Sequence, residues 1–209
     1  MSLRISLSGE PCCRRGGKVR YRYKEGCVIA EELILQRWRE RTRAATGEIF
    51  EGCRLRPNTW RVVSIIVATH GMGVLRDAEN LSAALQEVYG RYPTLRATTP
   101  GKLIDVMAIL RARGCLQQIL ERKRDEKHPG VPDLFLWRRK RDGQLFDGRF
   151  VEVKRWPARP GSREQVSPWQ RDEMAFLTKL KLKARPVYII DRWRVPETPS
   201  CAESAARRT

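Results

Sequence analysis

Two short apolar runs in the C-terminal half of the chain constrain the fold more than any other feature. Residues 134–137 and 150–154 are mainly apolar, and an Asp-Gly turn signal lies between them. Runs of this length around such a turn are typical of two paired β-strands. A helical pattern over residues 167–183, with Trp169 among its apolar positions, and an apolar run at 187–190 follow. Strand, helix and strand in this order predict a parallel crossover.

The sequence before these runs has the apolar spacing of helices. Residues 28–43 predict an amphipathic helix, and the segment 60–125 predicts several more, including helices over residues 78–89 and 99–113. The whole pattern therefore predicts an α/β fold, in which a mixed central β-sheet is flanked by helices and a mainly helical portion occupies residues 60–125.

The length of the chain is consistent with one core. Its 209 residues compare with about 100 to 200 for a typical domain, so we expect a single domain over residues 27–195. The basic, glycine-containing segment 1–26 is expected to be flexible or to form a hairpin, with an edge strand at 19–23. The small and polar residues of the tail, 196–209, predict disorder.

The charge of the chain points to a polyanionic partner. Forty-two Lys and Arg residues against twenty-four Asp and Glu give a formal net charge of +18. Such a field attracts nucleic acid and releases its counterions, although a solubility surplus or an acidic membrane surface would also account for charge alone.

The sequence also argues against several other classes of partner. No apolar stretch approaches the ~18 residues of a membrane span, and no signal peptide is apparent, so we expect no membrane partner. An intracellular location follows: the cytoplasm of a bacterium or of a phage-infected cell, or a eukaryotic nucleus. The glycines near His70 lack the remaining residues of a phosphate loop or a dinucleotide fingerprint, so no nucleotide cofactor is expected.

Two carboxylates and a lysine accompany the predicted strands. Asp133 precedes the first run, and Glu152 and Lys154 lie in the second, where alternation places both side chains on one face. Carboxylates are hard ligands for Mg²⁺ or Mn²⁺, the Val153 carbonyl can add a neutral oxygen, and Lys154 can stabilise charge on a phosphate. The pattern predicts a metal-dependent phosphodiesterase site. The alternative is a solvated strand edge on which Glu152 and Lys154 simply pair.

The same residues resemble a known nuclease family. Residues 130–137 (GVPDLFLW) and 150–154 (FVEVK) are similar to the signature of the virus-type replication-repair nuclease (VRR-NUC) domain, a branch of the PD-(D/E)XK superfamily. The segment 30–38 (AEELILQRW) resembles the opening helix of that family. The form most similar to this chain is the nuclease domain of the Fanconi-associated nuclease. The resemblance implies a restriction-endonuclease-like core and a DNA nuclease that uses Mg²⁺ or Mn²⁺.

The resemblance adds two residues to the expected site. Glu51, followed by glycine, falls where the family carries a third catalytic acid, and is carried over as a ligand of the metal or of water; Glu48 is the alternative. Gln170 lies in a segment similar to one with a polar glutamine near the site, where it would position water or a phosphate. Trp156, which stands two residues after Lys154, departs from the family pattern and leaves the choice of substrate open.

Two basic runs are expected to contact phosphates, one on the turn between the two strands and one on the loop after them. Trp156 would be available to stack on an exposed base. The alternative is that these runs are ordinary solvated surface. Their members are Arg138, Arg139, Lys140, Arg141, Arg155, Trp156, Arg159 and Arg163.

The resemblance further implies cleavage of branched, flapped or junction DNA of the kind that arises in repair and recombination. One alternative is a non-catalytic, basic nucleic-acid-binding protein that retains the fold. Another is a homodimer that resolves four-way junctions. The presence of Asp133, Glu152 and Lys154 favours an enzyme, because binding alone does not need two acids beside a phosphate.

Overall fold

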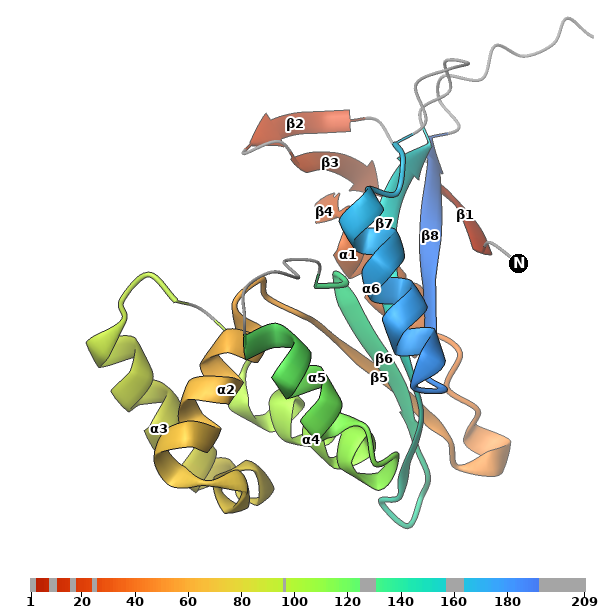
Figure 1. The fold of residues 1–209 in the computed structure, drawn as a ribbon. Coiled ribbons are helices and arrows are strands. Elements are labelled where there is room, and N and C mark those ends of the chain that lie inside the picture. Colours follow the sequence, from red (N-terminus) through yellow and green to blue (C-terminus); the bar gives the residue numbers. More distant parts are fainter. Residues whose placement is uncertain are drawn as a thin grey trace, which may run out of the picture.

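A five-stranded mixed sheet forms the centre of the fold (Figure 1), with the strand order β1-β8-β7-β6-β5. The computed structural model describes residues 3–7, 11–15, 18–23, 26–95, 97–124, 131–156 and 164–191. The strands of the sheet are β1 (Leu3–Leu7), β5 (Ile49–Arg54), β6 (Leu134–Arg139), β7 (Leu145–Trp156) and β8 (Lys183–Asp191). β1, β8 and β7 run parallel, whereas β6 is antiparallel to both β7 and β5. The predicted mixed sheet is confirmed.

The C-terminal half follows the predicted order of elements. β6 and β7 form an antiparallel hairpin, and α6 (Pro168–Lys179) carries the chain to β8, which is parallel to β7. β7 is longer than its apolar run because its pairing with β6 and β8 continues through polar residues such as Arg149, which a search for continuous apolar sequence does not include.

Helices cover both faces of the sheet. The predicted helical portion consists of α2 (Thr59–His70), α3 (Ala78–Arg91), α4 (Pro100–Ala112) and α5 (Leu116–Arg124), with a short 3-10 turn, η2 (Met72–Arg76), between α2 and α3. A second 3-10 turn, η1 (Ala44–Thr46), lies between α1 and β5. These helices share one core with Phe135, Trp137 and Phe150 of the sheet. On the other face, α1 (Ala30–Arg39) packs on Leu134 and Val151. Within the described residues, no helix is both long and apolar enough to cross a membrane.

The N-terminal segment contains more regular structure than expected. β2 (Pro11–Arg15), β3 (Lys18–Tyr23) and β4 (Gly26–Ile29) form a small antiparallel sheet in that order, so the expected hairpin is present. The strand at 19–23 is central in this sheet, however, and the expectation of an edge strand is wrong, because local propensity does not specify the neighbours of a strand. β1 was not predicted, although its apolar residues alternate with polar ones. The tail 196–209 lies outside the described residues.

A buried carboxylate stands at an irregular point of β7. Asp147 has a φ of 56°, close to the register shift between β6 and β7, and is 6% exposed. It accepts hydrogen bonds from Lys183 and Arg149, and Arg138 Nε lies 3.1 Å from its Oδ2. Although burial favours the protonated form, these hydrogen bonds and charges hold the pKa of Asp147 below its ordinary value.

Asp147→Asn is therefore expected to reduce stability at pH 7 by about 1 to 3 kcal/mol, the range for a buried group that loses charged hydrogen bonds. Because its folded pKa is lowered, the contribution of Asp147 is complete above its unfolded pKa of about 3.9 and is lost as the pH falls through the lower folded pKa. Urea unfolding at pH 7 and pH 3 measures both effects. A difference between wild type and variant that did not shrink at pH 3 would contradict this account.

Candidate active site

The site lies where β6 and β7 separate. Leu134, the first residue of β6, pairs with Val151, and beyond that position the register pairs β7 with β8 alone. Asp133 immediately precedes β6 and so stands in the opening between the two strands. The Val153 amide donates a hydrogen bond to Asp133 Oδ2 at 2.7 Å. A backbone donor of β7 therefore fixes the carboxylate of the neighbouring strand.

Glu152 and Lys154 lie side by side on β7. Lys154 Nζ is 3.0 Å from Glu152 Oε1, and each residue is 4% exposed. Burial and the nearby charge of Asp133 raise the pKa of Glu152 to about 7. Burial alone would lower the pKa of Lys154, but the hydrogen bond and charge of Glu152 raise it above its ordinary value. The site thus combines two mutually repelling acids with a lysine held in its charged form.

Gln170 connects the start of α6 to this pair of side chains. The backbone N–H of Gln170 donates to Ser167 Oγ at 3.2 Å, and the side-chain Oε1 of Gln170 accepts from the backbone N–H of Ser167 at 2.9 Å. These two hydrogen bonds make a reciprocal capping box. The other end of the same side chain, Nε2, donates to Glu152 Oε1. The helix cap therefore sets the orientation of the acid.

Glu164 also belongs to the site, and the sequence analysis did not identify it. Its Oε1 lies 3.5 Å from Lys154 Nζ, and its Oε2 accepts a hydrogen bond from the Arg155 amide at 2.9 Å. Glu164 is the only acidic residue between Lys154 and Ser167 in a segment rich in arginine. That isolation is a weak signal: a single acid in a basic segment is expected to pair with a nearby cation, but the sequence does not show with which one.

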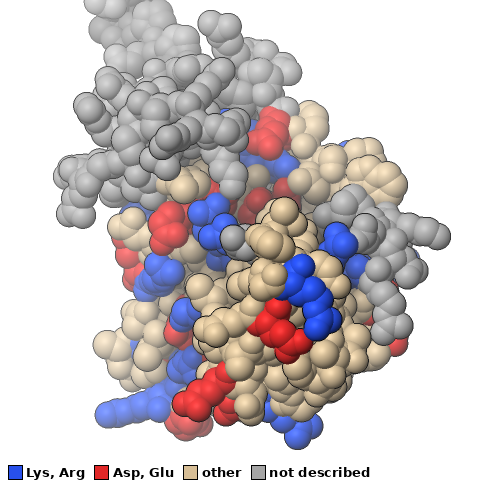
Figure 2. Space-filling model, turned by 90° about the vertical axis from the view of Figure 1, so that its left-hand side faces the viewer, with Lys and Arg blue, Asp and Glu red and all other residues tan. Residues whose placement is uncertain are grey.

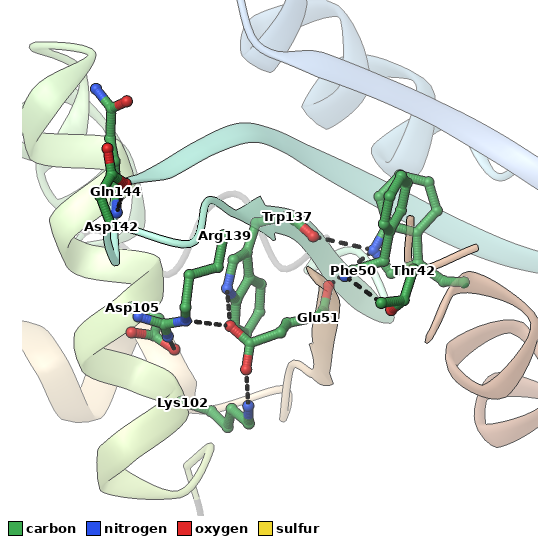
Figure 3. A network of polar contacts seen from close by, with 10 residues as sticks. Thr42, Phe50, Glu51, Lys102, Asp105, Trp137, Arg139, Asp142 and Gln144 are labelled. Carbon is green, nitrogen blue, oxygen red and sulfur yellow. Dashed lines mark hydrogen bonds and ion pairs between the residues drawn. The ribbon is translucent and has the colours of Figure 1, made fainter. Parts of the chain in front are cut away.

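The structure does not bring Glu51 to this site; Glu51 lies instead in a separate polar network with Trp137 and Arg139 (Figure 3). Glu51 pairs in register with Trp137, four residues along β6 from Asp133, which corresponds to about 13 Å of strand. Its Oε2 accepts hydrogen bonds from Trp137 Nε1 at 3.0 Å and Arg139 Nε at 2.8 Å, and Lys102 Nζ lies 3.1 Å from Oε1. Burial opposes ionisation, but these hydrogen bonds lower the pKa of Glu51. The network joins α4 to the sheet.

The turn between β6 and β7 is also distant from the site. Asp133 precedes β6 and the turn follows it, at the opposite end of a six-residue strand, so the contact of this basic run with phosphates stays a prediction. Two of its arginines are already paired with acids: Arg138 with Glu48 at 3.0 Å and Arg139 with Asp105 at 2.8 Å. The remaining members, Lys140 and Arg141, are exposed on the turn.

The second basic run is described only in part. Arg155 is half-buried and its amide donates to Glu164, whereas the side chain of Trp156 and all of Arg159 and Arg163 lie outside the described residues. On the side of α2 and α3, Figure 2 shows Lys and Arg side chains interspersed with Asp and Glu. On this face the positive charge is therefore not gathered into one patch.

One aromatic side chain beside the site is exposed, contrary to expectation. Trp169 was placed on the apolar face of its helix, but it is 58% exposed. The buried residues of α6 are Glu173 and Leu177. Helical spacing alone does not show where the packing partner of a helix ends, and Trp169 stands in the first turn, next to Gln170.

Comparison with known families agrees with this geometry. The family model of the VRR-NUC domain matches residues 79–188, which is more than half of the chain. The matched segment runs from α3 into β8 and contains Asp133, Glu152, Lys154 and Gln170, while Glu51 lies before it. No curated protein matches the chain.

Proposed function

Because the chain belongs to the VRR-NUC family, a family of nucleases that act on DNA, we propose that it is a divalent-metal-dependent deoxyribonuclease for branched, flapped or junction DNA, most similar to the Fanconi-associated type. The observation that carries this proposal is the meeting of Asp133, Glu152 and Lys154 where two strands of the sheet separate.

The donor atoms at this opening fit Mg²⁺ or Mn²⁺. Mg²⁺ is usually held by one or two carboxylates, with water and substrate phosphate in the other positions. Asp133 and Glu152 offer two such carboxylates, and their mutual repulsion favours a cation beside them. The Val153 N–H points to Asp133, and the N–H and C=O of a strand residue point to the same side, so its carbonyl is available as a neutral ligand. Among the described residues, no group of three or more Asp, Glu, His or Cys side chains suits a metal, so we assign the two-carboxylate form.

Each side chain at the site then has a distinct role. A divalent cation bound here would lower the pKa of a water molecule and offset negative charge on the phosphate. Lys154, kept charged by Glu152 and Glu164, donates to a phosphate oxygen as negative charge develops in the transition state. Gln170 is a positioning residue, because it orients the carboxylate of Glu152 and does not need to contact the substrate.

Trp169 supports a substrate that contains unpaired bases. It is an exposed aromatic ring next to Gln170, and α6 begins with a capping box that fixes this first turn. Stacking of a base on an aromatic side chain contributes about 1 to 3 kcal/mol. An unpaired base beside the cut site could use this ring, whereas a base inside a continuous duplex could not.

Trp169→Ala is expected to weaken binding of flap DNA by roughly 5- to 100-fold, the equivalent of one lost stacking contact. Affinity for an intact duplex should change much less, and Trp169→Phe should retain most of the flap affinity. Fluorescence anisotropy with Ca²⁺ in place of Mg²⁺ would measure binding. Equal losses on flap and duplex would rule out stacking on an unpaired base.

The proposed activity is tested by titration of Mg²⁺ and Mn²⁺ against labelled flap, nicked, four-way and linear DNA. We expect cleavage that requires the cation and is faster on branched substrates. Binding without cleavage at any cation concentration would instead identify a non-catalytic DNA-binding protein. Paired cuts confined to the four-way substrate, made by a protein with the mass of a dimer, would identify a junction resolvase.

A further inference from the structure

A second cluster of charge lies on the face of the sheet opposite Glu152. Here α1 and the residue Arg41 beyond it cover β7 and β8, and a recess opens between them. Its apolar floor includes Leu136, Val151 and Val187. Four arginines from three parts of the chain line the recess: Arg37, Arg41, Arg149 and Arg185.

A fixed tryptophan contacts two of these arginines. Trp38 is 5% exposed, and its Nε1 donates hydrogen bonds to the carbonyl oxygens of Glu51 at 2.8 Å and Trp137 at 3.1 Å. The guanidinium carbon of Arg149 lies 4.6 Å from the centroid of the Trp38 ring, and that of Arg41 lies 5.5 Å from it. Two of the arginines therefore contact one fixed ring, Arg149 from β7 and the exposed Arg41 from beyond α1.

The recess holds more positive charge than its acidic neighbours compensate. Arg149 is paired with Asp147, but its Nε is buried without a hydrogen-bond partner. In the part of the chain that the structure describes, neither Arg41 nor Arg185 forms an ion pair. Burial and the charges of Arg149 and Arg41 lower the pKa of Arg185, against a weaker attraction from Asp147. Arg185 is thus a partly buried charge without an ion-pair partner, which costs stability, and an anion in the recess would relieve that cost.

We propose that this arginine recess binds a phosphate group. Guanidinium groups present several N–H donors in a planar fork that matches the oxygens of a phosphate, and three of them from different elements can surround such a group. The apolar floor ends at the sheet and leaves no depth for a nucleoside behind the phosphate. A DNA strand or a free phosphate ion would present the same chemistry. Only binding of a DNA phosphate rests on the proposed function. In that case the recess would be a second DNA-binding site, on the face of the sheet opposite Glu152.

Thermal unfolding of the full chain at constant ionic strength tests the recess directly. We expect inorganic phosphate to raise the Tm of wild type in a saturable way, above the effect of chloride. Arg185→Gln should not lower the Tm in phosphate-free buffer, because it removes repulsion, and should weaken the response to phosphate by at least about tenfold, as expected for the loss of one charged contact. Arg41→Gln, from the other wall of the recess, should behave in the same way.

Arg39→Gln is the matched control. Arg39 lies on α1, the helix that also carries Arg37 of the recess. Its side chain is half-exposed, pairs with Glu32 and does not line the recess, so its substitution should preserve the phosphate response. Equal responses in Arg185→Gln and Arg39→Gln, or a wild-type Tm that phosphate raises no more than chloride does, would overturn the proposal.

Anisotropy with labelled flap DNA distinguishes the two sources. If DNA supplies the phosphate, Arg185→Gln weakens DNA binding more than Arg39→Gln does, and inorganic phosphate competes with DNA in wild type and in Arg39→Gln but not in Arg185→Gln. If the ligand is a free ion, DNA affinity is equal in both variants while the Tm response is still lost from Arg185→Gln. Asp133→Asn is expected to keep the phosphate response, so failure of the nuclease assignment and failure of the recess assignment can be told apart.

Discussion

Asp133→Asn is expected to reduce DNA cleavage by about 10³-fold or more, the rate equivalent of the several kcal/mol that a metal ion contributes to phosphoryl-transfer catalysis. Asparagine has the shape of aspartate and can still accept the hydrogen bond from the Val153 amide, so the opening between β6 and β7 should keep its geometry. It lacks the negative charge with which Asp133 would hold the proposed divalent cation. Single-turnover cleavage and anisotropy, measured on one flap substrate, should therefore show lost cutting with DNA affinity changed only a few-fold.

The matched control for this variant is Glu40→Gln. It removes one carboxylate charge from an exposed pair with Arg37, away from the site, and should leave the cleavage rate unchanged. Cleavage by Asp133→Asn at the rate of Glu40→Gln would remove Asp133 from the active site and with it the metal assignment.

Glu173→Leu is expected to destabilise the protein by about 3 to 5 kcal/mol, the cost of leaving a buried charge without its partner. Glu173 Oε2 lies 2.7 Å from Lys123 Nζ, with both side chains at most 4% exposed, and Arg122 Nε lies 3.2 Å from the same oxygen. Burial already lowers the pKa of Lys123, and the charge of Glu173 is what opposes that shift. Without Glu173, the charged form of Lys123 loses the largest attraction that offsets its burial.

A double variant tests whether charge, rather than shape, causes the loss. Lys123→Met combined with Glu173→Leu replaces the pair by apolar groups and should recover most of the stability in urea unfolding. Asp172→Asn, at an exposed partner of Arg122, should cost less than about 1 kcal/mol, as for other surface pairs. If Glu173→Leu lowered the free energy of unfolding no more than Asp172→Asn does, the Lys123–Glu173 pair would not be what joins α5 to α6.

Much of the architecture follows from the local sequence. The hairpin of β6 and β7, the crossover through α6 and the helices of the middle segment each have an apolar period and length that identify them without reference to the rest of the chain. Asp133, Glu152 and Lys154 could be associated for the same reason, because adjacent strands and side-chain alternation bring them together. Gln170 was placed by resemblance, and its contact with Glu152 agrees with that placement.

The positions of Glu51, the hairpin turn and Glu164 depend on contacts between distant segments, which no local sequence pattern encodes. The register of β5 against β6 places Glu51 opposite Trp137, and a carboxylate of the same chemical type as Asp133 thereby joins a structural network with Arg139 and Lys102. The turn between β6 and β7 is close to Asp133 in sequence, but it lies at the opposite end of β6 from Asp133. Glu164 reaches Lys154 only because the loop returns to β7, and a loop has no period from which such a return could be read.

The side-chain amide of Gln170 does two jobs with its two ends. The carbonyl end completes the first turn of α6, and the amino end donates to Glu152. Glutamate at this position could still cap the helix, but its carboxylate would replace the N–H donor with a second acid beside Glu152. Asparagine is one methylene shorter and cannot reach both Ser167 and Glu152. Each of these substitutions would therefore lose either the cap of α6 or the hydrogen bond that orients Glu152, and neither would be neutral.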